Sequence, residues 1–181
     1  MRDTSWESDA RYYNKQVGRS GHYYHQQVVI PGVVKLLEIK EGESVLDVGC
    51  GQGVLSREIN VGVEYVGIDA SKSLIEEAKR QNRNENHKFE AMRAENLNWE
   101  NKFEKAAAVL SLQNMAQQEE VIKKISVALK KNGELVFVLN HPCFRIPRQS
   151  GWGEHPNKLQ YRYVDRYLSS LEIPILMHPG E

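Results

Sequence analysis

One short segment, Val45 to Gly53, constrains the fold of this chain more than any other. An apolar run from Val45 to Val48, interrupted by Asp47, is followed by closely spaced glycines: Gly49, Gly51 and Gly53. Glycine has no Cβ, so it lets the backbone turn tightly and lets a ligand approach closely. The segment therefore predicts a buried strand that ends in a ligand-binding turn.

Strand and helix patterns alternate from this turn as far as residue 140. Short apolar runs predict further strands at residues 65–68, 88–91, 106–110 and 135–139. Apolar residues at helical spacing predict helices near residues 54–59, 72–78 and 121–129, with Ser71 as an N-cap and Gly133 ending the last of them. This alternation predicts an α/β fold, a doubly wound, mostly parallel sheet with helices on both faces.

The two ends of the chain differ from this core, which we place at residues 41–140. Residues 1–40 begin polar and aromatic and become apolar at helical spacing around Pro31, which predicts an N-terminal helical lid of two short helices or one kinked helix. Residues 141–181 hold five of the six prolines and predict an irregular segment on the substrate side, with a short helix at 162–171. We expect one domain overall.

Composition narrows the class of protein. Lysine and arginine (24) balance aspartate and glutamate (24), whereas proteins that grip nucleic acid through its phosphates usually carry a basic excess, so we expect a small-molecule substrate and no nucleic acid. Two cysteines suit a reducing compartment. No secretory signal or run of ~20 apolar residues is visible, so we expect a soluble, cytoplasmic protein without a membrane partner. The histidine spacing predicts no metal.

A second acid, Asp69, ends the strand expected at 65–68. A carboxylate at this place can accept hydrogen bonds from both hydroxyls of a ribose. The glycine spacing is G-x-G-x-G, whereas the dinucleotide fingerprint G-x-G-x-x-G would need a glycine where this chain has Val54. Because Asp47 would also repel a pyrophosphate, we interpret the turn as a site for a ligand with an ammonium and a sulfonium group. A nicotinamide-dependent oxidoreductase is the less favoured alternative.

These segments, together with the later LKKNGELVF, resemble the class I S-adenosylmethionine-dependent methyltransferases of the small-molecule type, over roughly residues 43–140. The resemblance implies a Rossmann-like fold, S-adenosylmethionine as cofactor, S-adenosylhomocysteine as product and methyl transfer to an acceptor that the sequence does not identify. It also implies that the methionine part of the cofactor is held by the glycine turn and its leading acid: Asp47, Gly49, Cys50, Gly51 and Gly53.

The other cofactor contacts that the resemblance implies follow the ends of three more strands. The resemblance implies that Asp69 and the residues after it bind the ribose. It also implies that the adenine lies beside a segment in which Arg93 replaces the family's usual aspartate. The wall near the methyl-bearing sulfur follows the strand at 106–110. The residues implied, in this order, are Asp69, Ala70 and Ser71; Ala94, Glu95 and Asn96; and Ser111, Leu112 and Gln113.

Methyl transfer from a sulfonium is an in-line displacement, so the protein must align the nucleophile and exclude water. The strand at 135–139 delivers His141 to the sheet edge where ligands bind, and His141 is the candidate base or substrate anchor. A residue that merely ends the strand is the alternative. We expect further substrate or lid contacts from polar and aromatic residues flanking the core: Tyr13, Arg19, His22, Tyr23, Tyr24, His25, Asn140, Arg145 and Trp152.

The residues after Leu139 depart from the family pattern. Family members usually close the sheet with another helix and a reversed hairpin of two strands, whereas this chain becomes rich in proline. We therefore expect the C-terminal sheet hairpin to be missing, because the chain is truncated or because a partner completes the sheet. A catalytically incomplete, cofactor-binding fragment is the corresponding alternative function.

Overall fold

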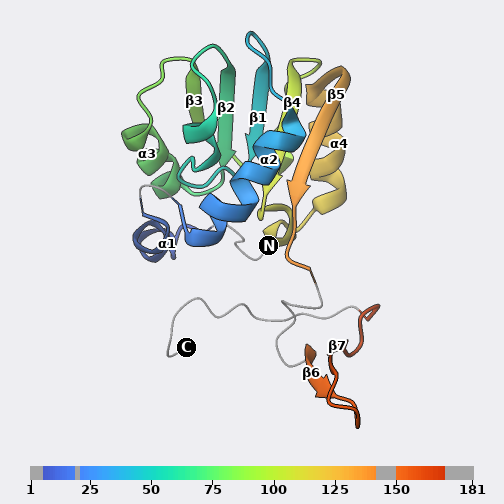
Figure 1. Cartoon of the computed structure of the whole chain (residues 1–181). Coiled ribbons are helices and arrows are strands. Elements are labelled where there is room, and N and C mark those ends of the chain that lie inside the picture. The colour runs from blue at the N-terminus through green and yellow to red at the C-terminus, as the bar shows by residue number, and fades with distance from the viewer. Residues whose placement is uncertain (1–5, 19–20, 142–149, 170–181) are drawn as a thin grey trace. The chain divides into compact units, whose positions relative to one another are not determined.

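A computed structural model describes residues 6–18, 21–141 and 150–169. Five parallel strands form one sheet in the order β3-β2-β1-β4-β5 (Figure 1). The sheet confirms the α/β, Rossmann-like prediction. Its strands are β1 (Ser44–Val48), β2 (Glu64–Asp69), β3 (His87–Ala91), β4 (Phe103–Val109) and β5 (Leu129–Val138).

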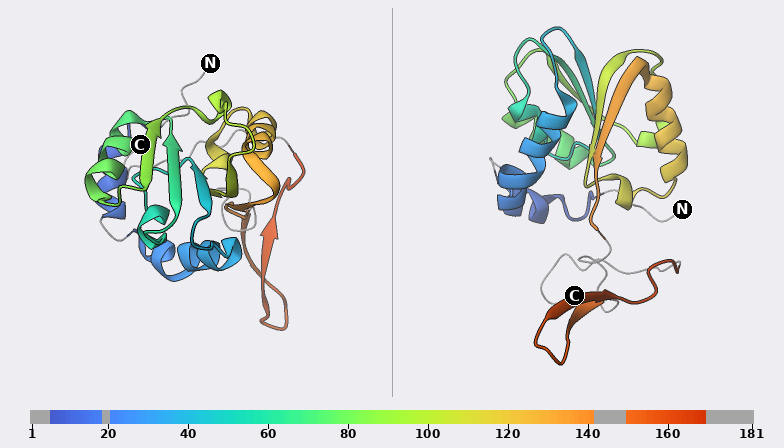
Figure 2. Two further views of the ribbon diagram at one scale, coloured as in Figure 1. Left: turned by 90° about the horizontal axis from the view of Figure 1, so that it is seen from above. Right: turned by 45° about the vertical axis from the view of Figure 1, so that its right-hand side comes forward.

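Helices cover both faces of the sheet, as a doubly wound fold requires (Figure 2). The helices α2 (Ile30–Leu37) and α3 (Lys72–Gln81) contribute to one core cluster, with Tyr65 and Phe89 from the strands. On the other face α4 (Gln118–Ala128) packs in a second cluster. Every residue of β1 is buried, as expected for a central strand covered on both faces.

The start of α3 follows the predicted capping. The Ser71 side chain accepts a hydrogen bond from the Leu74 backbone N–H at 3.2 Å, which satisfies one of the free donors of the first turn. The predicted apolar stripe is buried: Leu74, Ile75 and Ala78. The cap therefore fixes where the chain leaves the end of β2 and enters the helix.

Two predicted helix boundaries are wrong. The helix expected near residues 54–59 is only the 3-10 turn η2 (Leu55–Glu58), because Ile59 is already extended. The last helix ends at Ala128 instead of Gly133, since the following residues join the sheet beside β4. Gly133 lies inside β5, where an added Cβ would approach the Lys130 carbonyl to 2.9 Å, so close backbone contact and not helix capping explains this glycine.

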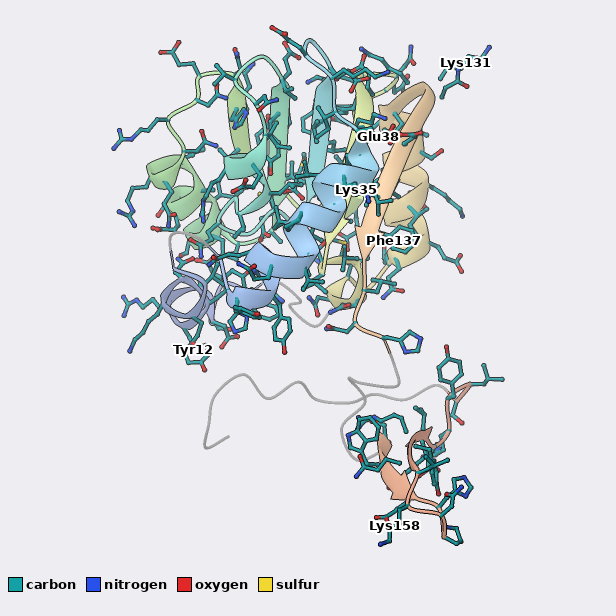
Figure 3. The ribbon with its side chains drawn as sticks, in the orientation of Figure 1. Tyr12, Lys35, Glu38, Lys131, Phe137 and Lys158 are labelled. Atoms are coloured by element: carbon teal, nitrogen blue, oxygen red, sulfur yellow. The ribbon has the colours of Figure 1, made fainter. Side chains whose placement is uncertain are left out.

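The N-terminal region is helical, as predicted. It contains α1 (Ala10–Val17) and a π-helical turn, η1 (His25–Val29), that continues directly into α2. Pro31 occupies the first turn of α2, directly after the π-helical turn, and proline is well tolerated at the first turn of an α-helix. Tyr12 lies on the outer side of α1 (Figure 3).

Residues 140–181 form a second compact unit, distinct from residues 1–139. Its described part is an antiparallel hairpin of β6 (Ser150–Glu154) and β7 (Gln160–Val164), so the predicted irregular segment with a helix at 162–171 is wrong there. The alternation of Tyr161, Arg162 and Tyr163 has the period of a strand. Within the described residues, no helix is long and apolar enough to cross a membrane.

Candidate cofactor site

The glycine turn follows β1 at the point where the strand order reverses, with β2 on one side and β4 on the other. Open α/β sheets bind their ligands outside the carboxyl ends of the strands at such a point. The φ angles of Gly49, Gly51 and Gly53 are +75°, +55° and +75°. These angles lie in the left-handed region that glycine enters without steric cost, so the path of the turn depends on all three glycines.

Gly49 lies against the turn that follows β4. A Cβ at this position would lie 2.4 Å from Ser111 Cβ and 2.9 Å from Ser111 Oγ. The Ser111 hydroxyl donates a hydrogen bond to the Val48 carbonyl at 2.6 Å, and Leu112 beside it is buried. Of the residues predicted to form the wall near the sulfur, Ser111 therefore supports the glycine turn directly, and Gln113 is half-buried.

Asp69 connects the glycine turn after β1 with the end of β2, the two segments that were predicted to share one ligand. Its Oδ2 accepts a hydrogen bond from the Gly51 N–H and its Oδ1 accepts one from the Ser71 N–H, both at 2.9 Å. Burial raises the pKa of Asp69, while these two hydrogen bonds oppose the rise. A carboxylate has about four lone-pair sites, so further acceptor capacity remains for ribose hydroxyls.

Asp47 is the most deeply buried acid of the site, with 2% of its surface exposed. Its Oδ2 accepts a 2.5 Å hydrogen bond from the Tyr65 hydroxyl. Burial raises the pKa of Asp47 to about 7, although the Tyr65 hydrogen bond lowers it. The second oxygen, Oδ1, has no hydrogen-bond partner among the described residues. An unpaired buried carboxylate oxygen is costly, so this oxygen fits a ligand that brings a donor.

Asp47 lines a small cavity of about 30 Å³. This volume suits one compact polar group, such as an ammonium. Three polar side chains line the cavity: those of Asp47, Tyr13 and His25. The remaining residues around the cavity are Ile30, Gly49, Cys50, Val54, Leu55 and Val109.

Cys50 and Gly53 serve packing within the turn. The Cys50 thiol is buried and free, and it lies 2.9 Å from where a Cβ of Gly67 would be. Burial raises the pKa of this thiol well above its usual range, so it remains protonated. A Cβ at Gly53 would lie 3.0 Å from the Phe89 ring and 3.3 Å from Ala78. These contacts hold the turn close to β3 and α3.

The residues predicted beside the adenine form a 3-10 turn, η3 (Ala94–Asn96), after β3. Ala94 is buried, Glu95 is half-buried and Asn96 is exposed. The Arg93 guanidinium, which stands where the family usually has an aspartate, lies 3.6 Å from the Glu95 carboxylate. Ala70, after the ribose acid, is exposed.

An N-terminal cover lies over the glycine turn. The Tyr13 ring from α1 lies 3.7 Å from where a Cβ of Gly51 would be, and Trp6 contacts Tyr13 edge-on with 5.6 Å between ring centroids. Burial raises the pKa of Tyr13 to about 12, and the nearby Asp69 contributes. The tyrosine predicted as a lid residue therefore reaches the site.

Glu7 attaches this cover to α3. Its Oε2 accepts hydrogen bonds from the Ser71 hydroxyl at 2.6 Å and the Ser73 N–H at 3.1 Å, and its Oε1 accepts one from the Ser73 hydroxyl at 2.6 Å. These bonds lower the pKa of Glu7 to about 2. Sequence reasoning missed Glu7, because an exposed acid far from α3 in the sequence carries no signal of its partner.

We expect Glu7→Gln to loosen the cover. The amide keeps the shape of the side chain, but one of the two acceptor oxygens becomes an NH2 donor, and the negative charge that favours the N-terminus of α3 is lost. At pH 7, amide hydrogen exchange of residues 10–17 should become faster, while exchange in α4 stays unchanged. Glu76→Gln on the exposed side of α3 is the control, and equal exchange in both variants would contradict the role given to Glu7.

The cluster from His22 to His25 is only partly directed at the site. Tyr23 and Tyr24 are 68% and 64% exposed, and the His22 ring stacks on Tyr24 at 5.8 Å. Among these four residues only His25 lines the Asp47 cavity. Its Nδ1 is buried without a hydrogen-bond partner among the described residues, and burial lowers its pKa.

Five other predicted residues are not tested by the structure. Arg19 and Arg145 lie outside the described residues. Asn140, His141 and Trp152 belong to the second unit; Trp152 packs there under the Arg162 guanidinium, 5.3 Å from the ring centroid. Their proposed substrate contacts stay predictions. In the part of the chain that the structure describes, no three His, Cys, Asp or Glu side chains are grouped to hold a metal ion.

Tyr65 is the second functional neighbour that sequence reasoning missed. In the parallel register of β1 and β2, Asp47 pairs with Gly67, and Tyr65 lies two positions earlier on the same face. The available signal was this alternation along β2. A tyrosine in a fully buried strand also needs a hydrogen-bond partner for its hydroxyl, and Asp47 supplies it.

Comparisons with known proteins agree with this geometry. Residues 39–147 match the family model of a methyltransferase domain. A ubiquinone biosynthesis O-methyltransferase of Pelagibacter ubique is 36% identical over 97 residues, which are 52% of this chain and 40% of that protein. A demethylmenaquinone methyltransferase of Staphylococcus saprophyticus is 26% identical over 111 residues, 58% of this chain and 47% of the relative.

A solved structure supports the fold. The crystal structure of an S-adenosylmethionine dependent methyltransferase from Mesorhizobium loti superposes with a TM-score of 0.70 at 23% identity, covering 84% of this chain and 68% of that one. The chain spans about half the length of the curated relatives it matches. The matched domain covers more than half of the chain, so the chain belongs to the methyltransferase-domain family.

Proposed function

We propose that this protein transfers a methyl group from S-adenosylmethionine to a small-molecule acceptor, and that it does so in the cytoplasm. The observation that carries the proposal is the unpaired, buried Oδ1 of Asp47 beside the glycine turn. A carboxylate in that position fits a ligand with an ammonium group, and the adjoining Asp69 fits a ribose. S-adenosylmethionine carries both groups.

The residues of the site fit distinct parts of this cofactor. Asp47 and the turn at Gly49 fit the amino-acid end, while Asp69 fits the ribose and η3 lies where the resemblance puts the adenine. When bound, the cofactor supplies an electrophilic methyl group on a sulfonium. The protein holds this group in line with the acceptor and keeps water away, a role for which the Tyr13 cover and the buried Leu112 are suited.

Two observations support a small acceptor and a reducing compartment. The relatives reported above include enzymes named for ubiquinone and menaquinone precursors, which are small molecules, and the balanced charge of this chain gives no basic excess for nucleic acid. The buried free thiol of Cys50 suits a compartment in which cysteines stay reduced. The acceptor itself is a matter for experiment.

Calorimetry with S-adenosylhomocysteine tests the proposal. We expect a dissociation constant in the micromolar range, which corresponds to about −8 kcal/mol, and transfer of labelled methyl from S-adenosylmethionine to one member of an acceptor panel of phenols, amines and thiols. Binding without transfer to any acceptor would favour the cofactor-binding fragment. Binding of reduced nicotinamide cofactor in place of S-adenosylhomocysteine would refute the proposal.

Asp69→Ala gives a second test. The substitution removes the acceptors for the ribose hydroxyls and also those for the Gly51 and Ser71 N–H groups. We expect affinity for 5′-methylthioadenosine, which retains the ribose, to fall by about 1–3 kcal/mol. Asp69→Asn, which keeps one acceptor oxygen, should lose less. Unchanged affinity in both variants, measured by calorimetry, would mean that the ribose is held elsewhere.

A further inference from the structure

His25 occupies an unusual place in the backbone. It is the first residue of the π-helical turn η1, and such turns are rare and frequent at functional sites. Gly21 packs against this turn: the Gln26 side-chain amide donates to the Gly21 carbonyl at 2.7 Å, and an added Cβ at Gly21 would lie 3.1 Å from His25 Cβ. These contacts fix the backbone of the turn, and His25 lines the cavity.

Two polar atoms around this one cavity lack a partner among the described residues: Oδ1 of Asp47 and Nδ1 of His25. A buried polar atom without a hydrogen-bond partner destabilises the protein. The rest of the lining is mainly aliphatic, so neighbouring side chains such as Ile30 and Val109 offer no hydrogen bond. Because Asp47 and His25 line the same cavity, a single ligand there can offer a partner to both side chains.

The chemistry of the pair defines that ligand. A carboxylate oxygen needs a donor or a cation, and an imidazole N–H needs an acceptor or an anion. The cavity volume of about 30 Å³ suits one compact group beside Asp47. An α-amino acid end carries an ammonium and a carboxylate on the same carbon atom, which matches both requirements.

We propose that His25 binds the α-carboxylate of the cofactor's amino-acid end, while Asp47 holds the ammonium. The inference rests on the proposed function, because it assigns a residue to the cofactor named there. It gives His25 a binding role that the glycine motif does not contain, and it separates His25 from its exposed neighbours His22, Tyr23 and Tyr24.

Three ligands separate the two contacts. S-adenosylhomocysteine carries both ammonium and carboxylate, 5′-(3-aminopropylthio)adenosine carries the ammonium alone, and 5′-methylthioadenosine carries neither. Calorimetry on the full chain with each ligand compares the wild type with His25→Ala and His25→Gln. His22→Ala is the matched control, because that histidine is exposed and three positions away.

We expect His25→Ala to weaken S-adenosylhomocysteine about 10-fold or more, the effect of losing a hydrogen bond to a charged group. The affinities of the other two ligands should stay unchanged. His25→Gln, which retains a donor, should recover part of the loss, and His22→Ala should bind all three ligands as the wild type does.

Other outcomes overturn the inference. Equal weakening of all three ligands by His25→Ala would show that His25 only packs the site. Unchanged affinities would show that the carboxylate is bound elsewhere, and lost methyl transfer with unchanged affinities would place His25 at the acceptor. If the wild type binds none of the three ligands, the proposed function itself fails. The wild-type measurement alone shows this, so it is distinguishable from a failure of the role given to His25.

Discussion

Gly49→Ala is expected to abolish measurable cofactor binding and to destabilise the fold. The left-handed φ of +75° costs a non-glycine residue about 1–2 kcal/mol. In addition, the new methyl group would lie 2.4 Å from Ser111 Cβ, a distance that requires the turns after β1 and β4 to separate, and overpacking of this kind costs about 1–3 kcal/mol. Separation of the two turns would displace Ser111 from the Val48 carbonyl.

Gly42→Ala separates the two effects. Gly42 has a similar φ of +82°, but an added Cβ there meets no atom within 4 Å. We expect Gly42→Ala to lose about 1–2 kcal/mol of unfolding free energy in urea and to bind S-adenosylhomocysteine as the wild type does. Gly49→Ala should lose about 2–5 kcal/mol in the same measurement. Equal behaviour of the two variants would mean that the contact with Ser111 does not constrain the site.

The sheet was predictable from sequence because its signals are local. Strands buried on both faces show as apolar runs, and the start of α3 shows in Ser71 and its apolar stripe. The end of α4 was not predictable, because Leu129 leaves the helix to pair with Phe103 of β4, which lies far from it in the sequence. Pairing between distant segments overrides local propensity at that point.

The site was predictable only where one motif contains it. The glycine turn and Asp69 each follow the end of a strand that the sequence predicts. The structure joins them through a hydrogen bond from the Gly51 N–H to Asp69. Tyr65 and Glu7 contact the site through side chains from elsewhere in the chain, and no spacing rule connects them to it. In the cluster from His22 to His25, His25 begins the π-helical turn. The period of a regular helix could not have indicated which of these residues faces inward.

Asp47→Asn is expected to stabilise the free protein and to weaken cofactor binding. Burial raises the pKa of Asp47 from 3.8 to about 7, so folding favours its protonated form. Below about pH 4 the carboxyl group is protonated in both the folded and the unfolded protein, and the free energy of unfolding has its full value. This contribution to the free energy of unfolding is lost as the pH rises through about 7. Asparagine carries no charge to desolvate, and its carbonyl oxygen still accepts the hydrogen bond from the Tyr65 hydroxyl.

The difference in unfolding free energy between Asp47→Asn and the wild type therefore depends on pH. It should be small at pH 4 and grow to the order of 4 kcal/mol in favour of the variant at pH 8, at about 1.4 kcal/mol per pKa unit. Urea unfolding from pH 4 to pH 8 measures it, and other groups that titrate in both proteins cancel in the difference. Asp165→Asn, at an exposed position, should show no such trend.

Binding should move in the opposite direction to stability. At pH 8 the wild-type carboxylate is charged, whereas the variant presents an amide donor to the cofactor's ammonium. Losing a hydrogen bond to a charged group costs about 1.5–3 kcal/mol, so S-adenosylhomocysteine should bind about 10- to 150-fold more weakly. A variant that is more stable yet binds less would show that the buried charge of Asp47 is retained for the ligand. A variant that binds equally well would give Asp47 a structural role alone.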